Sequence, residues 1–286
     1  MIRFAQDEMK DTLKHIWSVC FKDPGHYIDY FFENRFKPEQ TLVWLEDEKP
    51  AAMLSLLPCE LIDQGERIEA RYIYAVATLP EYRGRGISTH LLKEAQNILQ
   101  REEIPISLLV PAEKGLFDFY RERGYETMGS IRSVTLTAKE LKTYRQGGYQ
   151  LGVLTAQELY WMRGEYLDGT AYLSWDIPAL GYALGENGLT GGRAFKLELE
   201  YGEAYMVCHP FAEHVLIREI GSTAEMFGCC CDLLLSELPA EKYTFLLPSG
   251  SGLLEGIGED KPFGMACWNN DLHKEMLQAY LGLMLN

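Results

Sequence analysis

The sequence predicts an α/β (α+β) fold with a mixed central sheet flanked by helices. Strand-like and helix-like segments alternate from the first residues onward. A glycine-bearing turn, residues 83–86, joins an extended segment to an amphipathic helical one. Residues 106–110 form a fully apolar run, which is typical of a buried central strand. With 286 residues, the chain is long enough for two domains.

The segments before the glycine turn predict a strand, two helices and three further strands. The first helix is indicated by apolar residues at helical spacing, Met9, Leu13 and Ile16. A polar turn at residues 63–66 folds two long strands into a hairpin. Strands are expected at residues 1–4, 42–45, 51–62 and 67–78, and helices at residues 7–20 and 27–36.

The segments after the turn predict a helix, a buried strand, a short helix and a further strand. The long helix extends to about residue 100, and the short one spans residues 115–123. Gly124 stands in the usual glycine position after a helix. The two strands are expected at residues 106–110 and 133–137.

The second half of the chain predicts a mixed order of strands and helices after a polar, glycine-bearing boundary at residues 142–149. Ser222 and Glu225 stand at the spacing of a capping box and predict the start of one helix there. Helices are expected at residues 155–166, 222–237 and 271–285, and strands at residues 194–200, 203–208, 214–220, 243–247 and 265–268.

Residues 203–247 repeat the order of hairpin, helix and strand that is predicted for residues 51–110. The second copy has Gly221, Ser222 and Thr223 where the first has the Arg83–Gly86 turn. We therefore expect two domains, a catalytic one at residues 1–145 and a degenerate copy at residues 150–286.

The charge balance differs between the two halves of the chain, whose formal net charge is −15 at pH 7. Residues 1–148 carry 20 Lys and Arg against 23 Asp and Glu, a balance of −3. Residues 149–286 carry 7 against 19, a balance of −12. A nucleic-acid partner is therefore disfavoured. Acidic walls attract amines and weakly favour a cationic substrate, although a solvated acidic surface explains the same pattern more simply.

The seven cysteines show neither metal-site spacing nor a disulfide framework, and Cys229, Cys230 and Cys231 are consecutive. They predict free, mostly buried thiols, and therefore a cytoplasmic protein. No apolar run has the length of a membrane span, and the first residues do not resemble a signal peptide. Neither a membrane nor a bound metal is expected.

The turn from Arg83 to Gly86 has the features of an anion site. Ser88 follows at the start of the helix, whose first backbone N–H groups and dipole favour an anion. The glycines allow the backbone to approach the anion closely, and Arg83 and Arg85 add positive charge. A pyrophosphate suits such a site, while an ordinary glycine-rich turn is the alternative.

The pattern Arg83-x-x-Gly86-x-Ser88, preceded by a strand and Pro80, resembles the acyl-coenzyme A loop of the GNAT (GCN5-related) acetyltransferases. The order of elements over residues 1–140 resembles the GNAT core as well. Ser88 departs from that family's Gly or Ala at the last position. The resemblance implies acetyl-coenzyme A as co-substrate. It assigns cofactor binding to Val76, Thr78, Arg83, Gly84, Arg85, Gly86, Ile87 and Ser88, the first two through their main chain.

The resemblance also implies a catalytic residue. The run from Tyr120 to Gly124 and Tyr125 matches the family's Tyr-x-x-x-Gly-Phe/Tyr pattern, so Tyr120 is expected to protonate the departing thiolate. A free tyrosine has a pKa near ~10, close to the ~8.5 of a thiol. The alternative is a tyrosine that only packs. Glu113 stands near the position where many relatives carry an asparagine that contacts the pantetheine, so the sequence departs from the family there.

The general base is not identified by the sequence. Glu69 and the chain terminus are weak candidates, and Glu69 is more simply explained as an exposed strand carboxylate. His90 is expected to face solvent or the cofactor phosphates. His209 and His214 have no evident partner in the sequence and are more simply structural.

The resemblance implies an N-acyltransferase that transfers acetyl directly from acetyl-coenzyme A to a primary amine, on a small molecule or a peptide. The alternative is a non-catalytic acyl-coenzyme A sensor or regulatory module. The duplication resembles the first two lobes of the Eis-like acetyltransferases, without their third, sterol-carrier-like domain. Acceptor, acyl-chain preference and homo-oligomer formation are left open.

Overall fold

The computed structural model describes residues 1–269 and 278–283, and the chain forms two compact units. Unit 1 comprises Met1–Leu61, Arg67–Met128 and Gly264–Leu277, and unit 2 comprises Ile62–Glu66, Gly129–Phe263 and Gln278–Asn286. These bounds differ from the two expected domains. The polar stretch expected as a boundary is instead anchored in unit 2, where Arg145 pairs with Asp232 and the Gln146 amide donates to the Gly228 carbonyl at 3.0 Å.

Unit 1 contains a mixed sheet in the order β1-β2-β3-β4-β5-β13. Its strands are β1 (Ile2–Phe4), β2 (Thr41–Glu46), β3 (Lys49–Asp63), β4 (Glu66–Thr78), β5 (Ile106–Leu109) and the end of β13 (Glu259–Trp268). The β4–β5 pair is parallel, whereas β13 runs antiparallel to β5. The sequence places Met265–Trp268 far from β5, so only the tertiary structure adds this strand to unit 1.

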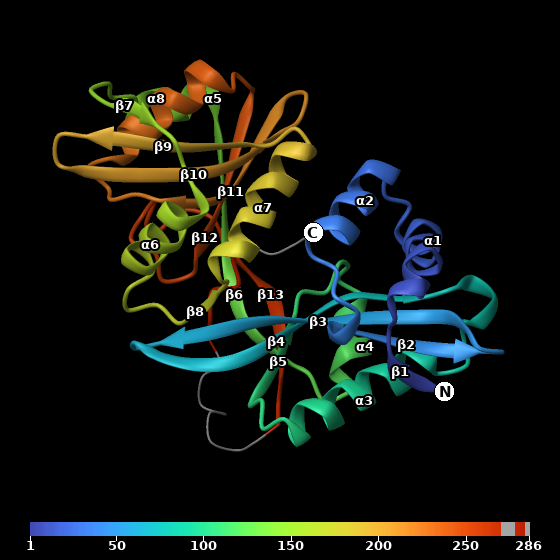
Figure 1. Ribbon diagram of the computed structural model, residues 1–286. Helices are drawn as coiled ribbons and strands as arrows, with labels where there is room; N and C mark the ends of the chain where they lie inside the picture. Colours follow the sequence, from blue (N-terminus) through green and yellow to red (C-terminus); the bar gives the residue numbers. More distant parts are fainter. Residues whose placement is uncertain (270–277, 284–286) are drawn as a thin grey trace. The chain divides into compact units, whose positions relative to one another are not determined.

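Helices cover both faces of the unit 1 sheet. The helices α1 (Lys10–Phe21) and α2 (Gly25–Asn34) lie on one face, and α3 (Ile87–Arg101) and α4 (Leu116–Arg121) on the other (Figure 1). The α3 side buries an aliphatic cluster that includes Leu91, Leu92 and Ala95. On the α1 side the Trp17 ring packs 4.7 Å from Phe31 and 5.6 Å from Tyr74, measured between centroids. Apolar burial on both faces therefore fixes the sheet between its helices.

The strands of unit 2 are hydrogen-bonded in the order β6-β12-β11-β10-β9-β7, with both parallel and antiparallel pairs. The strands are β6 (Glu126–Thr137), β7 (Gln150–Gly152), β9 (Arg193–Leu199), β10 (Gly202–Pro210), β11 (His214–Gly221) and β12 (Lys242–Pro248). The β11–β12 pair is parallel and is joined through a helix, as β4 and β5 are in unit 1. That unit 2 is a degenerate GNAT-like lobe stays a prediction.

The helices of unit 2 also cover two faces. They are α5 (Ala138–Leu141), α6 (Ala156–Tyr166), α7 (Ile177–Leu189) and α8 (Phe227–Glu237). Ala204, Met206 and Cys208 alternate along β10 and belong to the core built with α8. Tyr205 points to the opposite face, where its hydroxyl donates to the buried Glu219 carboxylate at 3.0 Å. All seven cysteines are free, and the consecutive three are buried in the α8 core.

Several expected element bounds are wrong. The helix α8 begins at Phe227 rather than Ser222, because the Ser222 hydroxyl donates to the Thr223 carbonyl instead of capping a helix. Capping boxes occur elsewhere, at Thr137 with Glu140 and at Thr155 with Glu158.

The closing helix expected at residues 271–285 lies largely outside the described residues. Residues 278–283 are described and are not helical, since Tyr280 forms a parallel bridge with Tyr172 of β8 (Tyr172–Ser174). The helix α7 was not predicted because its three glycines disfavour helix formation, although Asp176 caps it and Pro178 stands in its first turn. No helix in the described ranges is long and apolar enough to span a membrane.

Candidate functional site

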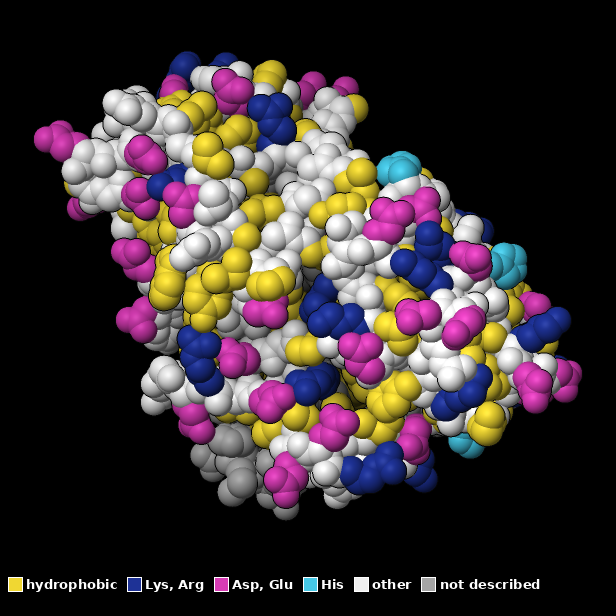
Figure 2. All heavy atoms as spheres, in the orientation of Figure 1, with side chains coloured by type: hydrophobic (Ala, Val, Ile, Leu, Met, Phe, Trp, Pro, Cys, Tyr) yellow, Lys and Arg dark blue, Asp and Glu magenta, His cyan; other side chains and the backbone are white. Residues whose placement is uncertain are grey.

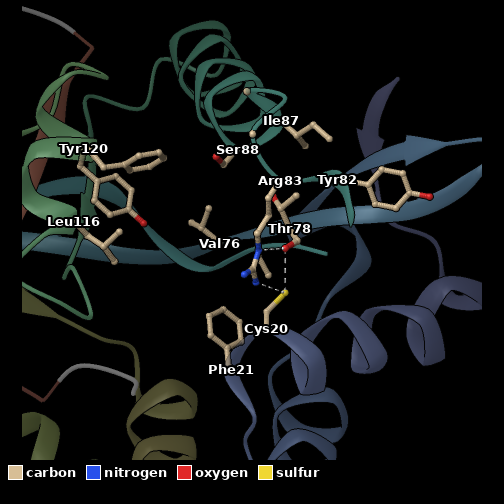
Figure 3. A pocket seen from close by; sticks show the side chains of 14 residues that line it. Cys20, Phe21, Val76, Thr78, Tyr82, Arg83, Ile87, Ser88, Leu116 and Tyr120 are labelled. Atoms are coloured by element: carbon tan, nitrogen blue, oxygen red, sulfur yellow. Dashed lines mark hydrogen bonds between the residues drawn. The ribbon is translucent and has the colours of Figure 1, made fainter. Parts of the chain in front are cut away.

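A cavity of about 310 Å³ opens in unit 1 beside the glycine-bearing turn (Figure 3). The end of β4, the turn and the start of α3 form one part of its wall. The rest comes from α4, through Leu116, Phe119 and Tyr120, and from the last turn of α1, through Cys20 and Phe21. Three segments that are distant in sequence therefore meet at one cavity: residues 20–21, 76–88 and 116–120.

The backbone of the turn needs its two glycines. Gly84 and Gly86 have φ angles of 75° and 73°, in the left-handed region that L side chains rarely adopt. Gly86 is the N-cap residue of α3, and in the described part of the chain no side chain caps this helix. The N–H groups of the first turn of α3 are thus free to bind an anion, and Ile87 and Ser88 bring that turn to the cavity wall.

The two arginines of the turn lie in different places. The Arg83 side chain lines the cavity, where Nε donates to the Thr78 carbonyl at 3.0 Å and Nη2 lies 3.7 Å from the Cys20 sulfur. Arg85 instead lies over the Tyr82 ring, at 5.2 Å from its centroid, with Nη1 3.5 Å from a Glu46 carboxylate oxygen. Of the residues expected to bind the cofactor, Arg85 is the one that does not line the cavity.

The end of β4 presents main-chain groups to the cavity. The parallel pairing joins residues 70–72 to residues 106–108, and β5 ends at Leu109. Residues 76–78 therefore run past the end of β5, next to Ala75, whose φ of 51° is unusual for a residue with a side chain. Val76 and Thr78 line the cavity, and the buried Thr78 hydroxyl has no hydrogen-bond partner within the described residues. A buried hydroxyl without a hydrogen-bond partner is uncommon in folded proteins.

Tyr120 lies on α4 with its ring buried and its hydroxyl directed into the cavity (Figure 3). The Phe119 and Tyr125 rings pack against it at 5.1 and 5.8 Å between centroids. Burial raises the pKa of Tyr120 to about 12, while the charge of Arg123 opposes that rise. The phenol is therefore protonated at any physiological pH, and its hydroxyl is able to donate a hydrogen bond.

The raised pKa bears on the role of general acid that the resemblance implies for Tyr120. Complete transfer of a proton to a thiolate with a pKa of ~8.5 would be uphill by ~3.5 pKa units, or ~5 kcal/mol. A hydrogen bond that shares the proton with the departing sulfur avoids that cost. The position of Tyr120 thus fits a donor that stabilises negative charge as it develops.

The other titratable candidates are not among the residues that line the cavity. The Glu69 carboxylate is 60% exposed and pairs with Arg71 Nη2 at 2.9 Å. The His90 ring stacks on Trp44 with the centroids 5.7 Å apart, and His209 and His214 belong to unit 2. Glu113 is exposed in the loop before α4. Among the described residues that line the cavity there is neither a carboxylate nor an imidazole.

The cavity wall also contains six residues that were not predicted from the sequence: Cys20, Phe21, Ala77, Tyr82, Leu116 and Phe119. Leu116 and Phe119 share one side of α4 with Tyr120, at helical spacing, which is a signal that could have identified them. No local sequence signal predicts that the end of α1 lies beside the glycine turn, because Cys20 and Thr78 are 58 residues apart in the sequence.

The comparisons agree with this geometry. The model of the acetyltransferase (GNAT) domain family matches residues 1–128, the part of the chain that resembles a GNAT domain. The expected GNAT resemblance and the mixed α/β fold are confirmed, and acyl transfer is the general chemistry that the family match indicates. No curated protein sequence matches the chain significantly.

Solved structures with the same fold extend over both units. A GCN5-related N-acetyltransferase from Anabaena variabilis is 19% identical, with a TM-score of 0.75 over 94% of this chain and 73% of that one. One from Kribbella flavida is 17% identical, with a TM-score of 0.74 over 94% and 72%. Eis1 from Mycobacterium abscessus is 13% identical, with a TM-score of 0.71 over 94% and 74%. The chain therefore shares the fold of GNAT proteins, Eis1 included, over nearly its full length.

Proposed function

We propose that this chain is an acyl-coenzyme A-dependent N-acyltransferase that moves acetyl from acetyl-coenzyme A to a primary amine. One observation carries the proposal: an anion-binding helix start and the buried Tyr120 hydroxyl face the same cavity. Acetyl-coenzyme A carries its pyrophosphate at one end of the pantetheine arm and its thioester at the other. The pyrophosphate would bind at the start of α3, and the thioester would lie beside the Tyr120 hydroxyl.

The residues present fit the coenzyme. The free N–H groups at Gly86–Ser88 suit a pyrophosphate, and Arg83 is close enough to turn towards it. The partnerless Thr78 hydroxyl and the main chain of Val76 and Thr78 would bind the amide-bearing pantetheine. In this assignment Arg83 leaves the Thr78 carbonyl when the coenzyme binds.

The reaction would be a direct transfer. The amine nitrogen attacks the thioester carbonyl, the carbon–sulfur bond breaks, and the sulfur leaves towards the Tyr120 hydroxyl. That hydroxyl donates a hydrogen bond to the developing thiolate. Since no carboxylate or imidazole is among the described lining residues, we propose that the ammonium loses its proton to water.

We propose that the acceptor is an amine on a small molecule or a peptide. We also propose that the chain is a cytoplasmic protein. Acidic side chains are interspersed with Lys and Arg over the visible face instead of separating into one basic stripe (Figure 2). With a net charge of −15, the chain attracts cationic amines by its long-range field and repels nucleic acid.

The second candidate is an acyl-coenzyme A sensor without turnover. The lack of a lining base among the described residues favours it. Incubation with acetyl-coenzyme A and a panel of primary amines separates the two, with free thiol measured over time. An enzyme releases thiol in molar excess over protein, whereas a sensor binds the coenzyme in calorimetry and releases none. Failure to bind acetyl-coenzyme A would refute both.

A further inference from the structure

We propose that Arg123 is a positioning residue, which fixes the Tyr120 hydroxyl relative to the anion-binding start of α3. This inference rests on the proposed function, because it concerns how the same cavity is held in shape. Arg123 follows the end of α4 and does not line the cavity.

The Arg123 side chain joins two elements of the cavity wall. Its Nε donates to the Thr89 hydroxyl, in the first turn of α3, at 2.9 Å. Its Nη1 donates to the Phe119 carbonyl of α4, and the guanidinium stacks 3.5 Å from the centroid of the Phe119 ring. One guanidinium therefore contacts both helices: its planar face stacks on the Phe119 ring, and its N–H groups donate to Thr89 and to the Phe119 carbonyl.

Both contacts lie one residue from the site. Thr89 follows Ser88, which lines the cavity at the anion-binding turn, and Phe119 precedes Tyr120. The main chain of Arg123 is fixed as well, because its N–H donates to the Tyr120 carbonyl at 2.9 Å and its carbonyl accepts from Gln96 Nε2 at 3.1 Å. A shift of the guanidinium thus moves the two walls relative to each other.

The short α4 depends on such a contact. It spans only six residues, Leu116–Arg121, and a helix of that length is unstable without tertiary support. The Arg123 side chain is 18% exposed, and its ion pair with Glu122 at 3.5 Å involves a carboxylate that is 78% exposed and contributes little. The contacts with Thr89 and Phe119 therefore help to hold the end of α4 against α3, together with the hydrogen bond from Gln96 to the Arg123 carbonyl.

Positioning predicts a kinetic effect that a purely stabilising residue lacks. A reacting group displaced by about 1 Å loses roughly 10²-fold in rate. The coenzyme is bound by the turn and by β4, which Arg123 does not touch, so its Michaelis constant is expected to change little.

The test compares Arg123→Met, Arg123→Lys, Thr89→Val and the double variant Thr89→Val/Arg123→Met with wild type. Arg121→Met is the matched control, since Arg121 lies on α4, is 58% exposed and pairs only with the exposed Asp118 among the described residues. We expect kcat to fall at least tenfold in Arg123→Met and at least threefold in Thr89→Val. In these variants the Michaelis constant for acetyl-coenzyme A should stay within threefold of the wild-type value. In Arg121→Met both kcat and this Michaelis constant should stay within twofold of wild type.

The double variant and the lysine variant decide the mechanism. If Arg123 acts through Thr89, the double variant is no worse than Arg123→Met. A lysine keeps the charge but cannot reach Thr89 and the Phe119 carbonyl together, so Arg123→Lys should lose at least fivefold. Additive losses, a lysine variant within twofold of wild type, or a rise in the Michaelis constant without a fall in kcat would each overturn the proposal.

A ligand-free measurement separates this inference from the proposed function. In protein labelled with ¹³C at the tyrosine rings, the Tyr120 resonance is assigned by its loss in Tyr120→Phe. We expect it to shift in Thr89→Val and in either Arg123 variant that folds, and to remain in place in Arg121→Met. If the Tyr120 resonance does not move in Thr89→Val and in the Arg123 variants, the positioning role is refuted. Absence of thiol release by wild type would refute catalysis but would leave this test of positioning valid.

Discussion

The Arg83 guanidinium donates a hydrogen bond from Nε to the main-chain carbonyl of Thr78 at 3.0 Å, across the mouth of the cavity. The Cys20 thiol donates to the same carbonyl at 3.3 Å. One strand carbonyl, one cation and one thiol thus form a cluster at the point where β4 meets the anion-binding turn (Figure 3).

Arg83→Met should weaken acetyl-coenzyme A binding by about tenfold, or ~1.4 kcal/mol, because a charge-assisted contact to pyrophosphate is lost. Calorimetry at two salt concentrations measures the loss, which should shrink at high salt. Arg101→Met is the control at the far end of α3, where Arg101 is 68% exposed and pairs with Glu94. Equal affinities for the two variants would contradict the role of Arg83.

Gly86→Val should reduce acetyl-coenzyme A affinity at least tenfold, about 1.4 kcal/mol. A valine strains the φ angle of 73° and places methyl groups beside the N–H groups that bind the anion. Gly25→Ala is a control at a helix start with open space around the new Cβ. Unchanged affinity of Gly86→Val, with native circular dichroism, would reject the turn as the pyrophosphate site.

Tyr120→Phe should lower kcat by roughly 10- to 1,000-fold with little change in the Michaelis constant for acetyl-coenzyme A. Because burial raises the pKa of Tyr120 to about 12, the wild-type contribution should be constant from pH 7 to pH 10. A kcat within twofold of wild type would mean that Tyr120 only packs.

The same raised pKa predicts a loss of stability in alkali. The neutral phenol is favoured in the folded state, so its contribution is complete below the unfolded pKa near pH 10 and is lost as pH rises towards 12. A difference of about two pKa units between the folded and unfolded states corresponds to roughly 2 to 3 kcal/mol in the free energy of unfolding. Urea unfolding at pH 9 and pH 11 should show a smaller decrease in Tyr120→Phe than in wild type, and equal decreases would contradict this.

Thiol titration should find seven free cysteines in anaerobically purified, denatured protein, in keeping with the thiols of the structure. In native protein, Cys20 should alkylate first because it is partly exposed, whereas burial raises the pKa of the partly exposed Cys267 to about 11 and slows its reaction. Burial raises the pKa of Cys230 to about 12, so that thiol should react slowly. Acetyl-coenzyme A should protect Cys20, which lines the cavity, and leave Cys267 unprotected; equal protection would oppose the cavity assignment.

Glu219→Gln should destabilise the protein by about 3 to 5 kcal/mol, since it leaves the buried Arg163 guanidinium without its carboxylate. Arg163 Nε donates to Glu219 Oε1 at 2.8 Å, and both side chains are at most 2% exposed. Glu198→Gln is the control at an exposed ion pair, because the Glu198 side chain that pairs with Lys196 is 46% exposed. Urea denaturation measures both, and a loss below 1 kcal/mol for Glu219→Gln would show that the pair is not coupled.

The sequence by itself determined the features that depend on neighbouring residues. Glycines with positive φ, followed by apolar residues at helical spacing, are a local signal, so the Arg83–Gly86 turn and α3 could be read directly. The place of Tyr120 followed from its spacing to Gly124 in a family pattern. Elements whose local signals conflict, such as the glycine-bearing α7, could not be predicted this way.

The tertiary structure decided what depends on contacts between distant segments. It brought Cys20 to Thr78, turned Arg85 towards Glu46, and added the end of β13 to the sheet beside β5. It also buried the Tyr120 phenol and thereby raised its pKa to about 12, which keeps the phenol protonated at neutral pH. Burial and cross-chain contacts are properties of the packed chain, because desolvation depends on every segment that surrounds a group.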